Sequence, residues 1–192
     1  MKLICYSLLT TIVFASGGFD HGTSAGKNKW DLSFTWNPYN YFKNGQSYLI
    51  LSYGITKNLD FHSYYSYSRQ DDQNYYFGLF NQFIRTKTID VATAIGIRAY
   101  SKNSIKHLFF PQLLYTLHLT NNIRLGGSFV NILSQEKLSF EGTSIDVFLM
   151  YKVYENKKIK IDLSLGGFKP VTWTPYSGDW YPTYSVDIKI KN

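Results

Sequence analysis

The chain has 192 residues, a formal net charge of +7 at pH 7 and an aromatic content of 18%. Its mean hydropathy of -0.21 argues against a bundle of membrane-spanning helices. The basic residues are dispersed along the chain instead of gathering on one face, which argues against nucleic-acid binding.

The first element in chain order is a predicted secretory signal peptide over residues 1–17. Lys2 precedes an apolar run from Leu3 to Phe14, and small residues follow, which predicts cleavage after Gly17. The alternative, an uncleaved anchor, is disfavoured because a spanning helix needs about 20 apolar residues. Residues 18–192 then form one exported domain. Cys5, the single cysteine, leaves with the signal, so the mature domain has neither a disulfide framework nor a thiolate metal site.

Ten runs of alternating apolar and small or polar residues follow, and each predicts a β-strand with one apolar face. The clearest pair is joined by the tight turn Thr56-Lys57-Asn58. Pro111 is expected to force a bulge in the sixth run, because proline cannot donate to a ladder. The runs cover residues 30–36, 49–55, 59–67, 75–84, 89–98, 112–119, 123–129, 145–153, 159–166 and 184–190, and the register of the fourth stays open because both its faces are apolar.

The predicted connections alternate between long and short, as in an outer-membrane barrel with short periplasmic turns and longer outside loops. The long ones lie near 37–46, 69–74, 100–106, 132–142 and 168–182, and the short ones near 56–58, 85–88, 120–122 and 155–158. The sequence therefore predicts a single up-and-down antiparallel transmembrane β-barrel of about ten strands in the bacterial outer membrane. Aromatic residues near strand ends, such as Trp30, Trp36 and Tyr53, are expected to form interfacial girdles.

Alternation alone does not say which face points inward. A secreted, soluble lipocalin-like ligand carrier would place the apolar face inside, whereas a membrane barrel reverses this. The polar faces are rich in small residues, which suit a cramped lumen, so the membrane orientation is favoured. We expect the charges to pair across the lumen, the acids Asp60, Asp90, Asp146, Asp162 and Asp187 with the bases Arg98, Arg124, Lys152, Lys160 and Lys189. The predicted polar lumen set is Asp60, His62, Arg98, His118, Arg124, Asp146, Lys152, Asp162 and Asp187.

Three stretches resemble the strand, periplasmic turn and strand units of small porin-like outer-membrane proteins. They read SYGITKNLDFHSYYSYS, YTLHLTNNIRLGGSF and MYKVYENKKIKIDLSLGG. The resemblance is to a class of protein and not to one family. It departs from the class at the end of the chain, where Ile190-Lys191-Asn192 replaces the usual terminal aromatic residue.

The favoured function is a narrow porin-like channel or a filled, structural barrel, since barrels of about eight strands are packed shut by side chains. The expected partners are outer-membrane lipids and lipopolysaccharide, together with small solutes, and no cofactor is expected. An outer-membrane enzyme, lipid-modifying or hydrolytic, is the alternative. It would use His62 or His118 with Asp60 or Asp90, although a hydrogen-bond network in the lumen explains the same residues. His21 and His107 are expected in leader or loop segments.

A further hypothesis is ligand or surface binding by the last loop, FKPVTWTPYSGDWYP. Trp173, Tyr176, Trp180 and Tyr181 lie there among prolines that stiffen the backbone. Flat aromatic rings can stack on a sugar or lie against lipid headgroups. The alternative is that these rings extend the outer aromatic girdle or cap the lumen.

Overall fold

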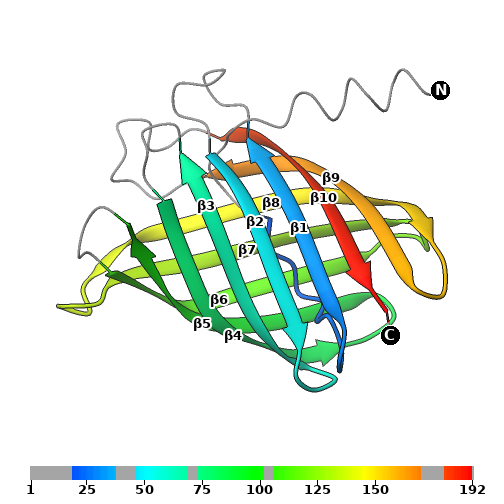
Figure 1. The fold of residues 1–192 in the computed structure, drawn as a ribbon, viewed down its shortest axis with the longest axis horizontal. Coiled ribbons are helices and arrows are strands. Elements are labelled where there is room, and N and C mark those ends of the chain that lie inside the picture. The colour runs from blue at the N-terminus through cyan, green and yellow to red at the C-terminus, as the bar shows by residue number, and fades with distance from the viewer. Residues whose placement is uncertain (1–18, 38–45, 69–72, 102–105, 170–179, 192) are drawn as a thin grey trace.

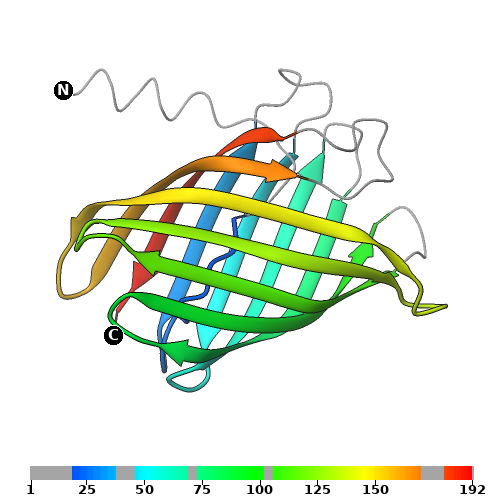
Figure 2. The same ribbon diagram turned by 180° about the vertical axis from the view of Figure 1, so that it is seen from behind.

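The computed structural model describes residues 19–37, 46–68, 73–101, 106–169 and 180–191 (Figure 1). Within them, ten strands pair antiparallel with their sequence neighbours, and the first pairs with the last to close a barrel (Figures 1 and 2). The strands are β1 Trp30–Asn37, β2 Gln46–Gly54, β3 Leu59–Ser68, β4 Gln73–Arg85, β5 Ile89–Tyr100, β6 Lys106–His118, β7 Ile123–Ser134, β8 Phe140–Glu155, β9 Ile159–Lys169 and β10 Tyr181–Ile190. The predicted fold class is confirmed.

The orientation of the side chains is that of a membrane barrel. Outward-facing Phe77 and Leu165 are 58% and 56% exposed, whereas inward-facing Thr116 and Ser128 are 0% and 1% exposed. A soluble barrel would not leave large apolar side chains over its outer surface and bury hydroxyl groups inside. No helix among the described residues is long and apolar enough to cross a bilayer.

The structure settles the register of β4, which the sequence left open. Tyr76, Phe80 and Gln82 point inward and are buried. Tyr76 stacks on Tyr64 of β3 with ring centroids 5.0 Å apart. Its ring occupies the space where a Cβ of Gly96 would lie, 2.3 Å from the nearest ring atom, so only glycine fits on the facing strand β5. The Tyr76 ring can therefore fill this part of the lumen only because position 96 on β5 is a glycine.

The start of β6 and one connection differ from the prediction. β6 begins at Lys106, so His107 lies in a strand and not in a loop. β7 extends to Ser134 and β8 begins at Phe140, which shortens the connection expected over residues 132–142. The extension was hidden because a register shift after Ile132 breaks the alternation on which strand prediction depends. The bulge expected at Pro111 is confirmed by the register shift between Phe109 and Gln112.

Candidate functional site: the barrel lumen and the segment inside it

The chain before β1 runs inside the barrel. Figures 1 and 2 show this segment, drawn in dark blue, enclosed by strands from both viewing directions. We call residues Phe19–Lys29 the plug segment. At its inner end Phe19 is buried and stacks on Phe148 of β8, with ring centroids 4.1 Å apart. The segment thus fills lumen space that the wall side chains leave open.

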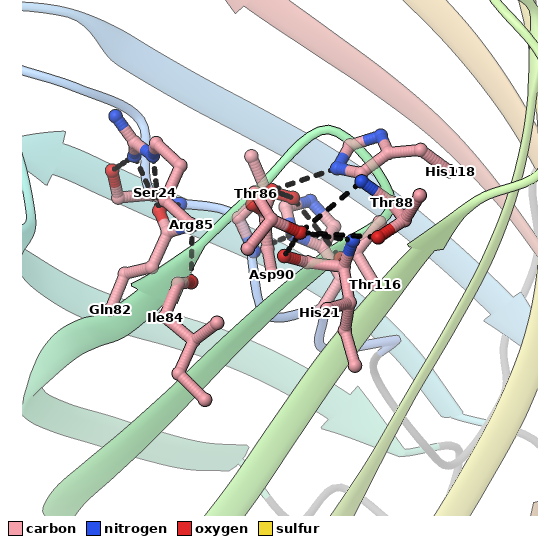
Figure 3. Close-up of polar contacts among 12 residues, drawn as sticks. His21, Ser24, Gln82, Ile84, Arg85, Thr86, Thr88, Asp90, Thr116 and His118 are labelled. Atoms are coloured by element: carbon pink, nitrogen blue, oxygen red, sulfur yellow. Dashed lines mark hydrogen bonds and ion pairs between the residues drawn. The ribbon is translucent and has the colours of Figure 1, made fainter.

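Ser24 is the most connected residue of the plug segment. Its backbone N–H donates to Gln82 Oε1 at 3.0 Å, and its carbonyl oxygen accepts from Lys189 Nζ at 2.8 Å. Arg85 Nη2 donates to Ser24 Oγ at 2.6 Å, and Arg85 also contacts Gln82, as Figure 3 shows. Wall residues from β4 and from β10 therefore hold one serine from two sides.

Thr23 and Ala25 are bound by wall carboxylates. Thr23 Oγ1 donates to Asp90 Oδ2 at 2.7 Å and lies 3.1 Å from Thr116 Oγ1. Asp90 Oδ2 is also 3.0 Å from His118 Nε2 (Figure 3). The Ala25 N–H donates to Asp60 Oδ2 at 2.6 Å. Two of the acids predicted to pair with bases across the lumen thus bind the plug segment instead.

Position 22 must be a glycine because the plug segment lies in close contact with the backbone of the barrel wall there. A Cβ built at this position would lie 2.7 Å from the carbonyl oxygen of Asp90 and 2.8 Å from Tyr115 Cα. Both are backbone atoms, which cannot move aside as the end of a side chain can. Any larger residue at position 22 must therefore displace the plug segment from strands β5 and β6.

The plug segment is tied to the barrel rim just before β1. Lys27 forms an isolated bridge with Gly54, and the Asn28 N–H donates to the Gly54 carbonyl at 2.7 Å. These backbone contacts join the segment to the end of β2. The rim end is therefore fixed by main-chain bonds, whereas the inner part is held mainly by wall side chains.

Asp162 is the lumen acid whose pairing follows the expected pattern, because Arg124 and Lys160 both form ion pairs with it. The others differ. Asp146 accepts from Ser128 Oγ at 2.6 Å, and Asp187 accepts from Ser164 and Ser185 at 2.7 Å each. Lys152 pairs with Glu155 beside a turn at 2.7 Å. The serines lie on the same strand as the acid or on a neighbouring strand, so short local bonds replace long pairs across the lumen.

Arg98 lies in an aromatic setting. Its guanidinium carbon is 5.0 Å from the centre of the Tyr100 ring and 4.8 Å from that of Phe109, within range for cation–π attraction. His107 lies beside it and pairs with Glu141 at 2.9 Å. His107 was expected in a loop without partners, and the structure instead gives it a buried position on the inner face of β6.

A cavity of about 40 Å³ remains between the plug segment and the wall. His21, expected in a leader segment, lines it together with Asp20, Asp31, Asp60, His62 and Asp187. A space of this size holds only a few water molecules. The part of the lumen between the plug segment and strands β1 to β3 therefore has space for little more than water.

The runner-up catalytic residue His62 has two polar partners in this cavity. Its Nδ1 lies 2.8 Å from Ser52 Oγ and its Nε2 lies 3.1 Å from Asp20 Oδ1. A serine, a histidine and an acid in contact are the groups that a hydrolase uses. A cavity of about 40 Å³ has no space for an acyl substrate beside the serine. The arrangement fits a hydrogen-bond network that attaches Asp20 of the plug segment to β2 and β3.

The predicted aromatic loop is only partly described. Trp173 and Tyr176 lie outside the described residues. Trp180 is 50% exposed. Tyr181 is the first residue of β10 and is buried, so it does not belong to an exposed loop surface.

No signal in the sequence predicted that the plug segment enters the barrel. The stretch FDHGTSAGKNK neither alternates like a strand nor shows helical spacing. The one indication is its run of small residues, Gly22, Thr23, Ser24, Ala25 and Gly26, which is what a backbone needs to pass close to a barrel wall.

A closed antiparallel barrel with an apolar outer surface and a polar, charged interior is the architecture of outer-membrane β-barrels. No protein-family model matches this chain, and no curated protein matches its sequence. Among solved structures, the KdgM porin, alone and in complex with disordered oligogalacturonate, aligns with a TM-score of 0.52 at 10% identity, covering 85% of this chain and 99% of the porin. The N-terminal barrel domain of Pseudomonas aeruginosa OprF aligns at a TM-score of 0.36 and 9% identity, over 86% of this chain and 98% of that domain. The chain thus has the fold of a small porin-like barrel.

Proposed function

We propose that this protein is a narrow channel of the bacterial outer membrane for ions and small solutes, and that its plug segment holds it shut. The observation that carries the proposal is how the plug is bound. Besides the Phe19 stack and the backbone contact at Gly22, its inner part is bound by hydrogen bonds to polar wall residues such as Asp60, Gln82 and Asp90. Withdrawal would expose these polar groups, which water can solvate, together with apolar wall side chains such as Phe80 and Phe148.

The export predicted from the sequence supports this proposal. Cleavage of the predicted signal after Gly17 would free the chain one residue before the buried Phe19. The plug segment would then have a free inner end and a rim end fixed at Gly54. A segment tethered at one end can leave the lumen without unfolding a strand. The barrel and the plug are thus separable in principle, since the strands close the barrel without the segment.

The outer surface supports a location in lipid. Large apolar side chains such as Phe34, Leu79 and Leu149 face outward and are well exposed, as acyl chains require. We propose that this belt contacts membrane lipid and that exposed Trp180 lies near lipopolysaccharide or lipid headgroups, where an amphipathic ring is stable.

Planar-bilayer recording tests the channel and its plug together. The full mature chain is expected to give rare, short openings, because the plug is bound at several points. In Gly22→Leu the added side chain meets the backbone of β5 and β6, so the open fraction should rise by at least ten-fold. Lys27→Gln is the matched control, because Lys27 lies in the same segment but is exposed at the rim.

Folding is checked by the heat-dependent mobility of each variant on gels. Folded Gly22→Leu protein that gives no current, or no more than Lys27→Gln, would refute the gated channel and favour a filled structural barrel.

A further inference from the structure

The cavity beside the plug segment is lined by acids, although the whole chain is basic. Asp20, Asp31, Asp60 and Asp187 face it, with His21 and His62, and no lysine or arginine is among its lining residues. We call this space the acidic chamber. The chain carries a formal charge of +7, so the sign of the chamber is opposite to that of the protein as a whole.

Two of these carboxylates have a basic side chain as a partner and two do not. Asp20 pairs with His62 at 3.1 Å, and Asp31 lies 3.9 Å from Lys189 Nζ. In the described part of the chain, Asp60 and Asp187 have no ion pair. Asp187 is bound only by serine hydroxyls. Asp60 binds the Ala25 N–H through Oδ2, while its Oδ1 has no hydrogen-bond partner even though the residue is only 3% exposed.

Asp60 lines this space, and a buried carboxylate without a basic partner is a site for a cation, because burying an unbalanced negative charge is otherwise costly. The nearby bases lie closer to other acids. Arg124 and Lys160 share the acid Asp162, and Lys189 lies 3.9 Å from Asp31 while it donates to the Ser24 carbonyl. Among the described residues, Asp60 and Asp187 are therefore the two chamber acids with no base within ion-pair distance.

We propose that the wall acids of the acidic chamber, Asp31, Asp60 and Asp187, bind small monovalent cations and make the channel cation-selective once the plug segment has left the lumen. This inference rests on the proposed channel function. It separates this protein from the KdgM porin of similar fold, which was solved with oligogalacturonate, a carboxylated sugar chain. An acidic chamber repels such an anion, so the polyanion is not the expected solute.

The test is the reversal potential of openings of the full mature chain across a KCl gradient. The sign of the potential distinguishes K⁺ from Cl⁻ preference, and we expect K⁺ preference. A carboxylate about 5 Å from a permeating ion contributes on the order of ten-fold to its preference in a partly hydrated lumen. Asp60→Asn and Asp187→Asn should each lower the K⁺ to Cl⁻ permeability ratio by about that factor, and the double variant should lower it further.

Glu136→Gln is the matched control, since it removes the same charge from an exposed turn between β7 and β8. Its permeability ratio should equal that of the unaltered chain. Anion-selective openings, or a ratio that the two Asn substitutions leave unchanged, would overturn the cation site while leaving the channel in place. Absence of any current, including from Gly22→Leu, would instead refute the channel and the cation site with it.

Discussion

The bond between Thr23 and Asp90 should set how often the lumen opens. Thr23→Val keeps the side-chain volume but removes the hydroxyl that donates to Asp90 Oδ2 at 2.7 Å. A hydrogen bond to a charged group is worth about 1.5–3 kcal/mol. Because 1.4 kcal/mol corresponds to ten-fold in an equilibrium constant, the open-to-closed ratio should rise about 10- to 150-fold.

A double-mutant cycle isolates this bond in single-channel records. Thr23→Val, Asp90→Asn and their combination are compared by open probability, and the combined effect should be well below the product of the two single effects. Thr143→Val is the control, because it removes a threonine hydroxyl bonded to Asn131 Oδ1 at 2.7 Å, on the opposite face of β8 from Asp146. If the effects of the two single variants on the open probability simply multiply in the double variant, this bond does not hold the plug. The same follows if Thr143→Val raises the open probability as much as Thr23→Val does.

Three further predictions concern the barrel itself, each measured by urea unfolding in lipid vesicles. Asp162→Asn leaves Arg124 and Lys160 without their shared acid and should lower the free energy of unfolding by about 3–5 kcal/mol. Glu155→Gln, which removes an exposed acid, should lower it by under about 1 kcal/mol. Equal losses of stability in the two variants would contradict the buried pairing. Tyr76→Ala should lower the free energy of unfolding by about 3–5 kcal/mol because it removes the ring that packs on Tyr64 and Phe109. Tyr76→Phe loses only the hydrogen bond from Gln112 and should lower it by about 1 kcal/mol. A loss of about 1 kcal/mol in the alanine variant as well would argue against that packing. Leu165→Arg places a charge on the lipid side of β9 and should lower the free energy of unfolding by about 2–4 kcal/mol. Unchanged stability would indicate that this surface faces water.

The strands and their two faces were predictable because alternation is a local property of the sequence. Thr116, Ser128 and Asp162 lie inward, and their apolar neighbours lie outward, as the pattern predicts. Strand ends failed where the period breaks, as at the register shift after Ile132 that hid the start of β8. The tight turn at Thr56 could be predicted from its own residues alone, since it is held by a local hydrogen bond in which Thr56 Oγ1 accepts from the Leu59 N–H at 2.9 Å.

The contents of the lumen could not be predicted in the same way. Which group meets Asp60 or Asp90 depends on strand tilt around the closed barrel and on the plug segment, and neither leaves a periodic signal. Charge counting suggested long acid–base pairs, yet Asp187 is bound by serines of β9 and β10. The Ser52–His62–Asp20 contact likewise joins a strand pair to a segment that no pattern placed there.

A reversible cross-link between the plug and the wall tests the account most directly. Thr23 Oγ1 and Thr116 Oγ1 lie 3.1 Å apart, so Thr23→Cys combined with Thr116→Cys brings two sulfur atoms within bonding reach. When the protein is produced from Gly18 onward, the pair has no competing thiol, because Cys5 is the single cysteine of the sequence. Oxidised protein should be silent in a planar bilayer, and reducing agent should restore openings, while each single cysteine variant ignores the reductant. Protein shown by mass spectrometry to be cross-linked, yet conducting as well as its reduced form, would contradict a lumen closed by its own N-terminal segment.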